Sequence, residues 1–143
     1  MNQNDAAMNA AAAKIIFIVA GISLVIGLIV AIFYLLTLQK ALNRCAPENR
    51  AMAPGLVWLM LIPLFNLVWH FFVVLNIAKS FDAEFQKRGM SEPAMPGKTI
   101  GLVMCILACC CWIPFLNLLT DLGYLVCWII YWVQIAGYSK KLA

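Results

Sequence analysis

The chain has 143 residues, of which 65% are hydrophobic and 11% are charged, and its mean hydropathy is +0.94. Soluble globular domains carry about 25% charged residues, so this composition excludes a separate soluble domain and indicates an integral membrane protein. The net charge of +4 comes from basic residues near the ends of apolar segments. That placement is typical of membrane proteins, and it does not predict nucleic-acid binding.

Four stretches contain no Lys, Arg, Asp or Glu, namely residues 15–39, 51–78, 99–120 and 122–139. A helix needs roughly 20 residues to cross a bilayer. The pattern therefore predicts an all-α fold in which residues 1–143 form a single membrane domain with three or four membrane helices.

The first stretch, residues 15–39, is expected to be a retained transmembrane helix, because it is too long for the apolar region of a signal peptide. Asp5 is a candidate N-cap, and the helix is expected to continue past the membrane to about Cys45. Small residues recur every four positions, a pattern that allows close helix packing, at Ser23, Gly27 and Ala31. Whether their partner is the same chain or another stays open.

A six-residue motif occurs twice inside apolar sequence, as Ile-Pro-Leu-Phe-Asn-Leu at 62–67 and Ile-Pro-Phe-Leu-Asn-Leu at 113–118. Each copy follows a Pro-Gly pair. Proline removes a helical hydrogen bond, and hydrocarbon offers no water as a replacement partner. We therefore expect two backbone breaks, each supported by an amide that bonds freed carbonyl groups, at Pro63 with Asn66 and at Pro114 with Asn117.

The first motif copy, residues 54–88, has two alternative arrangements. Only a short segment separates Gly55 from Pro63, which favours a re-entrant hairpin, whereas the apolar length of residues 51–78 favours a span. The sequence then becomes amphipathic, with Ile77, Phe81 and Phe85 on one face. We expect this part to lie on the cytoplasmic membrane surface and to end at Gly89.

The second copy, residues 96–139, is expected to form a transmembrane hairpin. Pro114 and Asn117 fall near its turn, and Thr120 with Asp121 are candidate N-cap residues for the returning helix.

Basic residues set the expected orientation. If the first copy spans, the ten basic residues divide between both sides of the membrane; if it re-enters, nine lie on one side and only Lys14 on the other. The charge rule favours the re-entrant alternative, and both alternatives place the carboxyl terminus in the cytoplasm. Cys45 is the one cysteine in a polar connection, so we expect it to be open to thiol reagents.

Few residues carry chemistry. His70 lies one turn after Asn66, so both share a helix face, and an intramembrane ionisable group is a functional hypothesis. Together with Asn117 these residues form a candidate polar pathway, although a structural role for each is the simpler expectation. No Cys/His metal spacing, nucleophile–base pair or phosphate-binding loop occurs. We expect no cofactor, no bound metal and no enzymatic activity.

The motif resembles uncharacterised families of bacterial polytopic membrane proteins over roughly residues 30–143. Their pattern is a helix ending in basic residues, then Pro-Gly, Trp, Ile-Pro-x-x-Asn-Leu and a partly polar helix before a final hairpin. Here these parts are residues 34–44, Pro54-Gly55, Trp58, residues 62–67 and 79–88, and Thr99 onward. The resemblance implies a bacterial inner-membrane location but no activity, and the apolar residues 68–75 depart from the pattern.

The leading hypothesis is a non-catalytic membrane protein that acts as a structural or assembly subunit in the lipid bilayer, bound to itself or to other membrane subunits. The alternative is a small oligomeric channel or transporter with Asn66, His70 and Asn117 lining a polar pathway. A weaker third hypothesis is a membrane-shaping protein with shallow hairpins.

Overall fold

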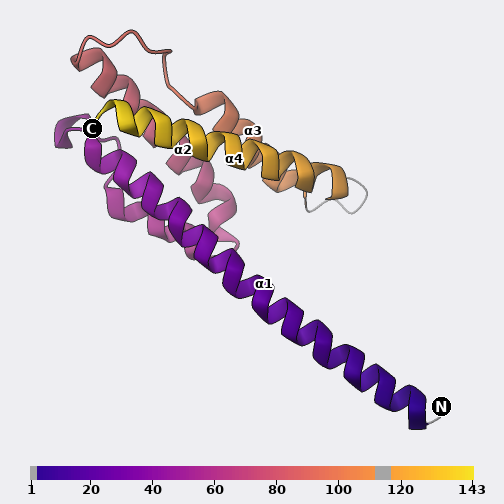
Figure 1. Cartoon of the computed structure of the whole chain (residues 1–143). Helices are drawn as coiled ribbons and strands as arrows, with labels where there is room; N and C mark the ends of the chain where they lie inside the picture. Colours follow the sequence, from indigo (N-terminus) through magenta and orange to yellow (C-terminus); the bar gives the residue numbers. More distant parts are fainter. Residues whose placement is uncertain (1–2, 112–116) are drawn as a thin grey trace. The chain divides into compact units, whose positions relative to one another are not determined.

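The computed structural model describes residues 3–111 and 117–143, and the side chains of residues 8–111 and 120–143. These residues form helices joined by turns, with no strand among them, as the all-α prediction requires. The chain divides into two compact units, residues 1–34 and residues 35–143. Figure 1 shows the elements in chain order.

Helix α1 covers Gln3–Arg44, so the prediction that the first helix continues almost to Cys45 is confirmed. The prediction that Asp5 caps this helix is wrong, because α1 already includes Asp5 within its first turn. From residue 8 to residue 29, the apolar side chains of α1 are exposed. Ile16, Phe17 and Leu24 are 66%, 78% and 75% exposed.

The small-residue stripe lies on this open part of α1. Ser23 and Gly27 are exposed and Ala31 is half-buried. No atom lies within 4 Å of the position that a Cβ at Gly27 would take. The stripe therefore has space for a partner, and its role in helix packing stays a prediction.

The first motif copy folds as a short helical hairpin. Pro54 begins the 3₁₀ helix η2 (Pro54–Leu61), the backbone breaks at residues 62–64, and helix α2 (Phe65–Lys87) follows. The expected break at Pro63 is confirmed. The η2 helix packs beside α2, where the indole Nε1 of Trp69 donates to the Leu56 carbonyl at 2.9 Å.

The chain before this hairpin also runs along α2, in the opposite direction. After the short helix η1 (Pro47–Asn49), the backbone N–H of Ala51 donates to the Ser80 hydroxyl at 2.9 Å. The segment from residue 46 to residue 61 thus descends beside α2 from its carboxyl end toward its amino end. A single straight span over residues 51–78 is absent from this fold, because η2 and α2 are separate antiparallel elements.

Helix α2 contradicts the prediction of an amphipathic arm that lies apart on a membrane surface. It is one helix of 23 residues, and its apolar stripe is in the protein core, with Phe81 0% and Phe85 2% exposed. Both rings contact Tyr138 of α4 (Asn117–Lys141), at centroid distances of 6.1 and 6.0 Å. The stripe is thus covered by a distant part of the same chain.

The end of α2 matches the sequence prediction. Gly89 has φ = 65°, a conformation that glycine adopts without steric cost. Its N–H donates to Gln86, and the N–H of Met90 donates to Phe85. These two bonds form a Schellman motif.

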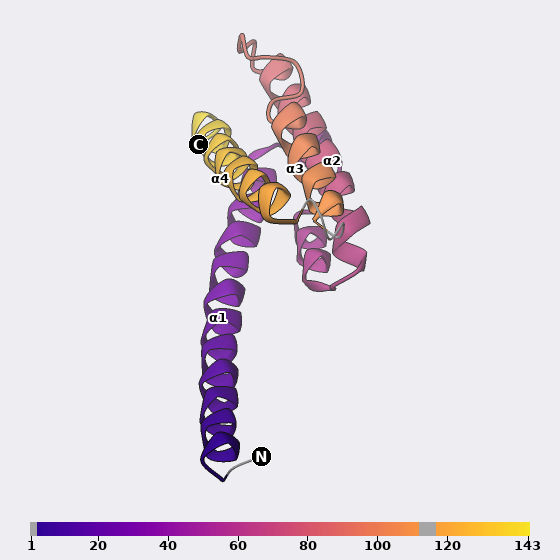
Figure 2. The ribbon, with the colours of Figure 1, turned by 90° about the vertical axis from the view of Figure 1, so that its right-hand side faces the viewer.

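Helix α3 (Lys98–Cys110) packs against both α2 and α4, and Figure 2 shows the three side by side. Gly101 lies where they meet: a Cβ on it would lie against Val74 of α2 and 2.9 Å from the Tyr131 ring of α4. A Cβ on Gly97 would lie 3.1 Å from Ile135. These two pairs run in opposite directions, so α3 is antiparallel to α4 and the two helices form a hairpin, whose transmembrane position stays a prediction.

The start of α4 differs from the prediction. Helix α4 begins at Asn117, so Thr120 and Asp121 lie inside its first turns and do not cap it. Pro114 and the side chain of Asn117 lie outside the described residues. The predicted second break at Pro114 and its supporting amide therefore stay predictions.

The last turns of α1 run parallel to α4. Trp132 Nε1 donates to the Thr37 hydroxyl at 2.9 Å, and the Arg44 guanidinium donates to the Ser139 hydroxyl at 3.1 Å. Both pairs have a sequence separation of 95 residues. The carboxyl ends of α1, α2 and α4 consequently lie at the same end of the unit formed by residues 35–143, together with the amino end of α3.

By length and composition, two of the described helices could cross a membrane, over Met8–Arg44 and Thr120–Lys141. Helix α3 is apolar but shorter, since its 13 residues span only about 20 Å. The described helices thus include two with transmembrane character, where the sequence predicted three or four.

Candidate functional site

The first predicted site is the break before α2, with Asn66 and His70. The backbone N–H of Asn66 donates to the carbonyls of Ile62 and Pro63, at 2.9 and 3.0 Å. The side-chain oxygen Oδ1 of Asn66 is buried and has no hydrogen-bond partner among the residues that the structure describes. The backbone of Asn66 therefore performs the carbonyl bonding that we expected from its side chain.

His70 lies one turn further along α2 and is 5% exposed. It shares a helix face with Asn66, as predicted from the spacing. The third predicted pathway residue, Asn117, begins α4, but its side chain lies outside the described residues. The structure thus brings two of the three pathway residues onto one buried face and does not describe the third.

A second polar site, which we did not predict from the sequence, centres on Glu84. Its side chain is 3% exposed and accepts three hydrogen bonds. The donors are the Ala46 N–H at 2.8 Å, the Asn49 amide at 2.7 Å and Arg88 Nε at 2.8 Å. We call these four residues the Glu84 cluster; they join the chain after α1 to the last turns of α2.

The cluster compensates a charge that burial alone would disfavour. Burial opposes ionisation of Glu84, but the bonds from Asn49, Ala46 and Arg88, together with the Arg88 charge, outweigh it. The pKa of Glu84 is therefore lowered. A carboxylate that accepts several hydrogen bonds stays ionised at neutral pH, so the cluster contains a charged Glu84.

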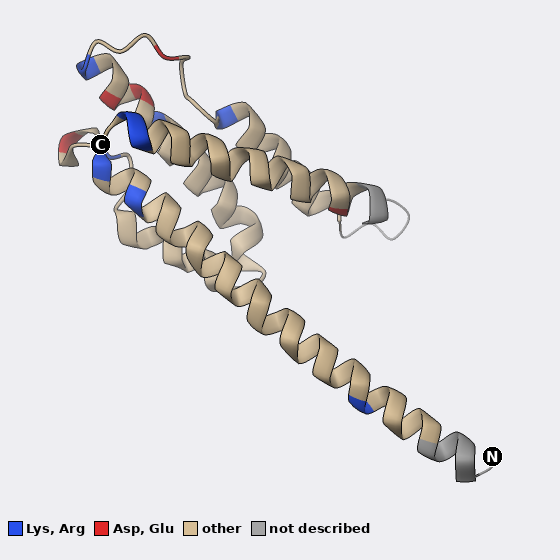
Figure 3. Ribbon diagram, viewed as in Figure 1, with Lys and Arg blue, Asp and Glu red and all other residues tan. Residues whose placement is uncertain are grey.

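Further polar contacts extend the cluster into a larger region, which we call the polar end. Arg44 Nη1 donates to the Ser139 carbonyl at 2.7 Å, and Arg88 Nη1 donates to the Leu142 carbonyl at 3.3 Å. Lys141 forms an ion pair with Glu92. Residues 44–50, 84–92 and 139–142 are thereby held at one end of the helices, where Figure 3 shows charged residues gathering.

One feature of the polar end is a local consequence of helix structure. The last turns of α1, α2 and α4 carry basic residues, Arg44, Lys87, Lys140 and Lys141. Cations are favourable at helix carboxyl ends, where carbonyl groups leave a partial negative charge. Three such ends meeting here explain part of the local excess of positive charge.

The position of Glu84 in the sequence is a signal for a buried polar site that our predictions did not use. Glu84 lies three residues after Phe81 and adjacent to Phe85, and so within the apolar stripe of α2. A carboxylate in an apolar stripe is costly to bury without partners. Its position therefore indicated a bonding site for another segment, although the identity of that segment could not be deduced.

The structure contradicts the prediction that Cys45 is open to thiol reagents. The Cys45 side chain is 1% exposed, and burial, followed by the charge of Glu84, raises the pKa of its thiol to about 11. Thiol reagents attack the thiolate, so Cys45 is protected by the fold itself on either side of a membrane. All six cysteines are free thiols, and no set of three metal-binding side chains occurs among the described residues.

Comparison with known proteins adds no identity: no family model, no curated protein and no solved structure matches this chain.

Proposed function

We propose that this protein is a non-catalytic integral membrane protein that serves as a structural or assembly subunit of a homo- or hetero-oligomeric membrane complex. The observation that carries the proposal is the open surface of α1. Along its most apolar stretch, none of the described residues is buried by the chain itself. A surface of this kind requires lipid or another apolar helix as its partner.

The proposed topology rests on the polar end. Residues 44–50, 84–92 and 139–142 are held together by Arg44, Glu84, Arg88 and Lys141, and so occupy one side of the membrane. Nine of the ten basic residues then lie toward that side, which the charge rule places in the cytoplasm. Helix α1 crosses to expose its amino end, and the η2–α2 hairpin enters and leaves on the cytoplasmic side.

The hairpin dimensions favour re-entry. The eight residues of η2 extend roughly 16 Å as a 3₁₀ helix, about half of the 30 Å hydrocarbon thickness. Leu64 and Val68 beside the break are 75% and 74% exposed, which suits the tip of a shallow hairpin in lipid. The bacterial inner membrane remains our proposed location.

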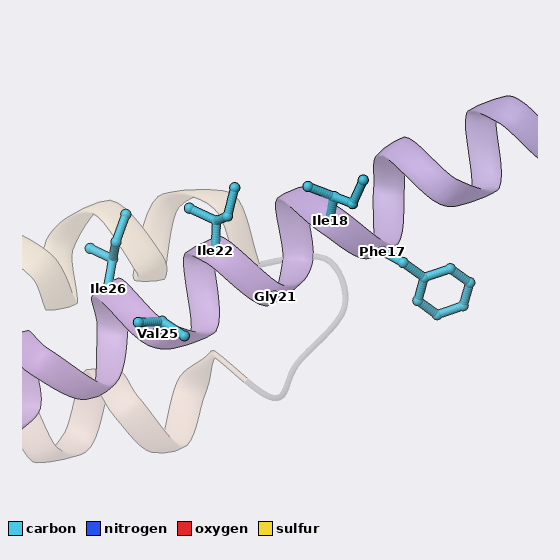
Figure 4. Close-up of a pocket in the computed structure, with 6 residues that line it drawn as sticks. All are labelled: Phe17, Ile18, Gly21, Ile22, Val25 and Ile26. Atoms are coloured by element: carbon cyan, nitrogen blue, oxygen red, sulfur yellow. The ribbon is translucent and has the colours of Figure 1, made fainter.

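Two faces of α1 are available for self-association, and each carries a glycine. Gly27 belongs to the stripe with Ser23 and Ala31. Gly21 lies about 120° around the helix from it, at the floor of an apolar depression whose lining Figure 4 shows: Phe17, Ile18, Ile22, Val25 and Ile26. Close packing of membrane helices uses small residues, and we assign the subunit contact to the Gly27 face, where small residues repeat.

Matched substitutions test this assignment. In mild detergent the protein should have a mass well above the 15.9 kDa of one chain, measured by light scattering corrected for detergent. Gly27→Leu should reduce it toward one chain, whereas Gly21→Leu should not. A parent protein that is monomeric and has no co-purifying subunit would contradict the proposal. If only Gly21→Leu abolished assembly, the subunit contact would have to be assigned to the Gly21 face instead.

A channel or transporter is the second candidate, supported by the buried and unpartnered Oδ1 of Asn66. In that case Asn66 and His70 would line a polar pathway, with Asn117 of α4 as the third member. Flux of an ion through proteoliposomes that Asn66→Leu abolishes, without loss of thermal stability, would favour this function over the structural one.

A further inference from the structure

The described part of the unit formed by residues 35–143 carries more positive charge than its carboxylates neutralise. Among the described residues, three ion pairs occur: Lys87 with Glu48, Arg88 with Glu84, and Lys141 with Glu92. In the described part of the unit formed by residues 35–143, four lysines have no carboxylate within ion-pair distance: Lys40, Lys79, Lys98 and Lys140. The first two are exposed and Lys98 is half-buried.

Three of these lysines lie at one level along the helices, although they come from three different helices. The 95-residue offset between α1 and α4 places Lys40 beside Ile135. Gly97 contacts Ile135 directly, so Lys98 of α3 has the same level. Gly101 of α3 lies against Val74 of α2. Because α2 and α3 run in opposite directions, one turn back along α3 corresponds to one turn forward along α2. Lys79 of α2 therefore lies within about one residue of that level.

We call Lys40, Lys79 and Lys98 the lysine ring. The helix dipole does not account for it. Lys40 and Lys79 precede the last turns of α1 and α2, and Lys98 is the first residue of α3. A cation at a helix amino end is unfavourable, so the helix dipole gives no reason for a lysine at position 98.

The lysine ring borders an apolar surface on each helix. Leu36 lies one turn from Lys40 on the side away from the polar end, Phe72 lies two turns from Lys79, and Ile106 lies two turns from Lys98. These side chains are 45%, 43% and 54% exposed. Lysine side chains extend along apolar surface toward water, so we expect each ammonium group to lie where hydrocarbon contact ends.

We propose that the lysine ring binds the phosphate groups of anionic phospholipids in the leaflet that faces the polar end. The inference rests on the proposed membrane insertion, and charge complementarity identifies the ligand. Three lysines without a carboxylate partner lie at one level, and exposed apolar side chains lie one or two turns further from the polar end, which matches a layer of phosphates above acyl chains. Each lysine near an anionic surface contributes roughly fivefold to lipid affinity, which gives about hundredfold for the ring.

Lipid titration of the purified protein in neutral detergent tests the proposal. Bound phosphatidylglycerol and phosphatidylcholine are counted by native mass spectrometry. The parent should bind phosphatidylglycerol selectively, and the triple variant Lys40→Gln, Lys79→Gln, Lys98→Gln should lose about two orders of magnitude in affinity. The matched control is Lys87→Gln, Lys140→Gln, Lys141→Gln, which removes the same charge above the ring and should retain most of the affinity.

Any of the following outcomes would refute the lysine ring as a site for anionic phospholipids. Equal loss in both triple variants would show general attraction to a basic protein, and equal binding of phosphatidylcholine would show that headgroup charge is irrelevant. Stabilisation by inorganic phosphate, with no selectivity for phosphatidylglycerol, would identify a site for a free anion instead. If the triple variant does not fold, Lys40→Gln and Lys79→Gln alone should each lose about fivefold, and unchanged affinity in both would refute the proposal.

The outcome of the lipid titration can be distinguished from the outcome of the test of the proposed function. A monomeric protein that still binds phosphatidylglycerol through the ring would refute the assembly role and keep the lipid site. A protein that assembles through Gly27 without lipid selectivity would do the reverse.

Discussion

At the scale of single residues, Gly101 shows how closely the helices approach. It is buried where α2, α3 and α4 meet, and a Cβ there would press against Val74 and the Tyr131 ring. Glycine lowers helix stability by about 1 kcal/mol relative to alanine. Its presence within α3 is therefore explained by close packing and not by local helix preference.

The matched pair Gly101→Ala and Gly137→Ala separates these two effects. No atom lies within 4 Å of a Cβ at Gly137, so alanine should raise the thermal stability of the detergent-solubilised protein there. Gly101→Ala should lower it, because overpacking costs about 1–3 kcal/mol and exceeds the gain in helix preference. Thermal unfolding followed by circular dichroism measures both, and equal stabilisation by the two variants would contradict the packing at Gly101.

Glu84 gives a prediction on pH dependence. Because its pKa is lowered in the folded protein, the stabilisation is complete above the ordinary glutamate pKa of about 4.3. It is lost as the pH falls through the lower folded value, where the carboxylate takes up a proton and the bonds from Ala46, Asn49 and Arg88 weaken. Thermal midpoints should accordingly decrease on acidification below about pH 4.3.

The matched variants are Glu84→Gln and Glu48→Gln. Hydrogen bonds to a charged group contribute roughly 1.5–3 kcal/mol, so Glu84→Gln should destabilise the protein at neutral pH and reduce its acid sensitivity. Glu48 forms an exposed ion pair with Lys87, and such pairs contribute little, so Glu48→Gln should resemble the parent. The Glu84 cluster would be refuted if both variants behaved alike.

At the scale of elements, local signals in the sequence predicted what local structure decides. Pro63 predicted the break before α2, and Gly89 predicted its end, because both depend on the backbone of a few neighbouring residues. Candidate caps at Asp5 and Thr120 were wrong, since the helices begin earlier than these polar residues. A residue suited to capping gives no information on whether the helix already exists before it.

The amphipathic part of α2 shows what could not be predicted from the sequence. The stripe of Ile77, Phe81 and Phe85 was identified correctly, but its partner was not. The covering ring belongs to Tyr138, far away in the chain, and a helical stripe does not indicate which surface it meets. Likewise, the burial of Cys45 results from packing that its polar neighbours in sequence do not reveal.

The position of the stripe gives an element-level prediction. Phe81→Ala should lower the free energy of unfolding by about 3–5 kcal/mol, because Phe81 is 0% exposed. Phe72→Ala, on the same helix, removes a side chain that is 43% exposed and should have a much smaller effect in detergent. Denaturation in a mild detergent measures both, and weakened membrane attachment with unchanged stability for Phe81→Ala would restore the hypothesis of a surface-lying arm.

At the scale of the whole molecule, topology can be tested with introduced thiols, since Cys45 is buried. Asn9, Glu48 and Ser91 are exposed and report on the amino end, the connection after α1 and the connection after α2. In intact cells a membrane-impermeant maleimide should label Asn9→Cys only, and Glu48→Cys and Ser91→Cys should react after the cells are opened.

The unmodified protein is the blank for this experiment, because its own six cysteines give the background signal. Labelling of Glu48→Cys in intact cells would show that the connection after α1 faces outward. The first motif copy would then span, against the hairpin of η2 and α2 on which the proposed topology rests.

The polar end also has a consequence for the order of events during synthesis. Ala46, Asn49, Glu84 and Arg88 are all translated before α4, so the Glu84 cluster can close while the ribosome still holds the rest of the chain. Arg44 instead waits for the Ser139 carbonyl in the last turn of α4, and the second contact of Arg88 waits for the Leu142 carbonyl just after that helix. Biogenesis would thus proceed in two stages, and a nascent chain stalled before residue 139 would lack the carbonyl partners of Arg44 Nη1 and Arg88 Nη1.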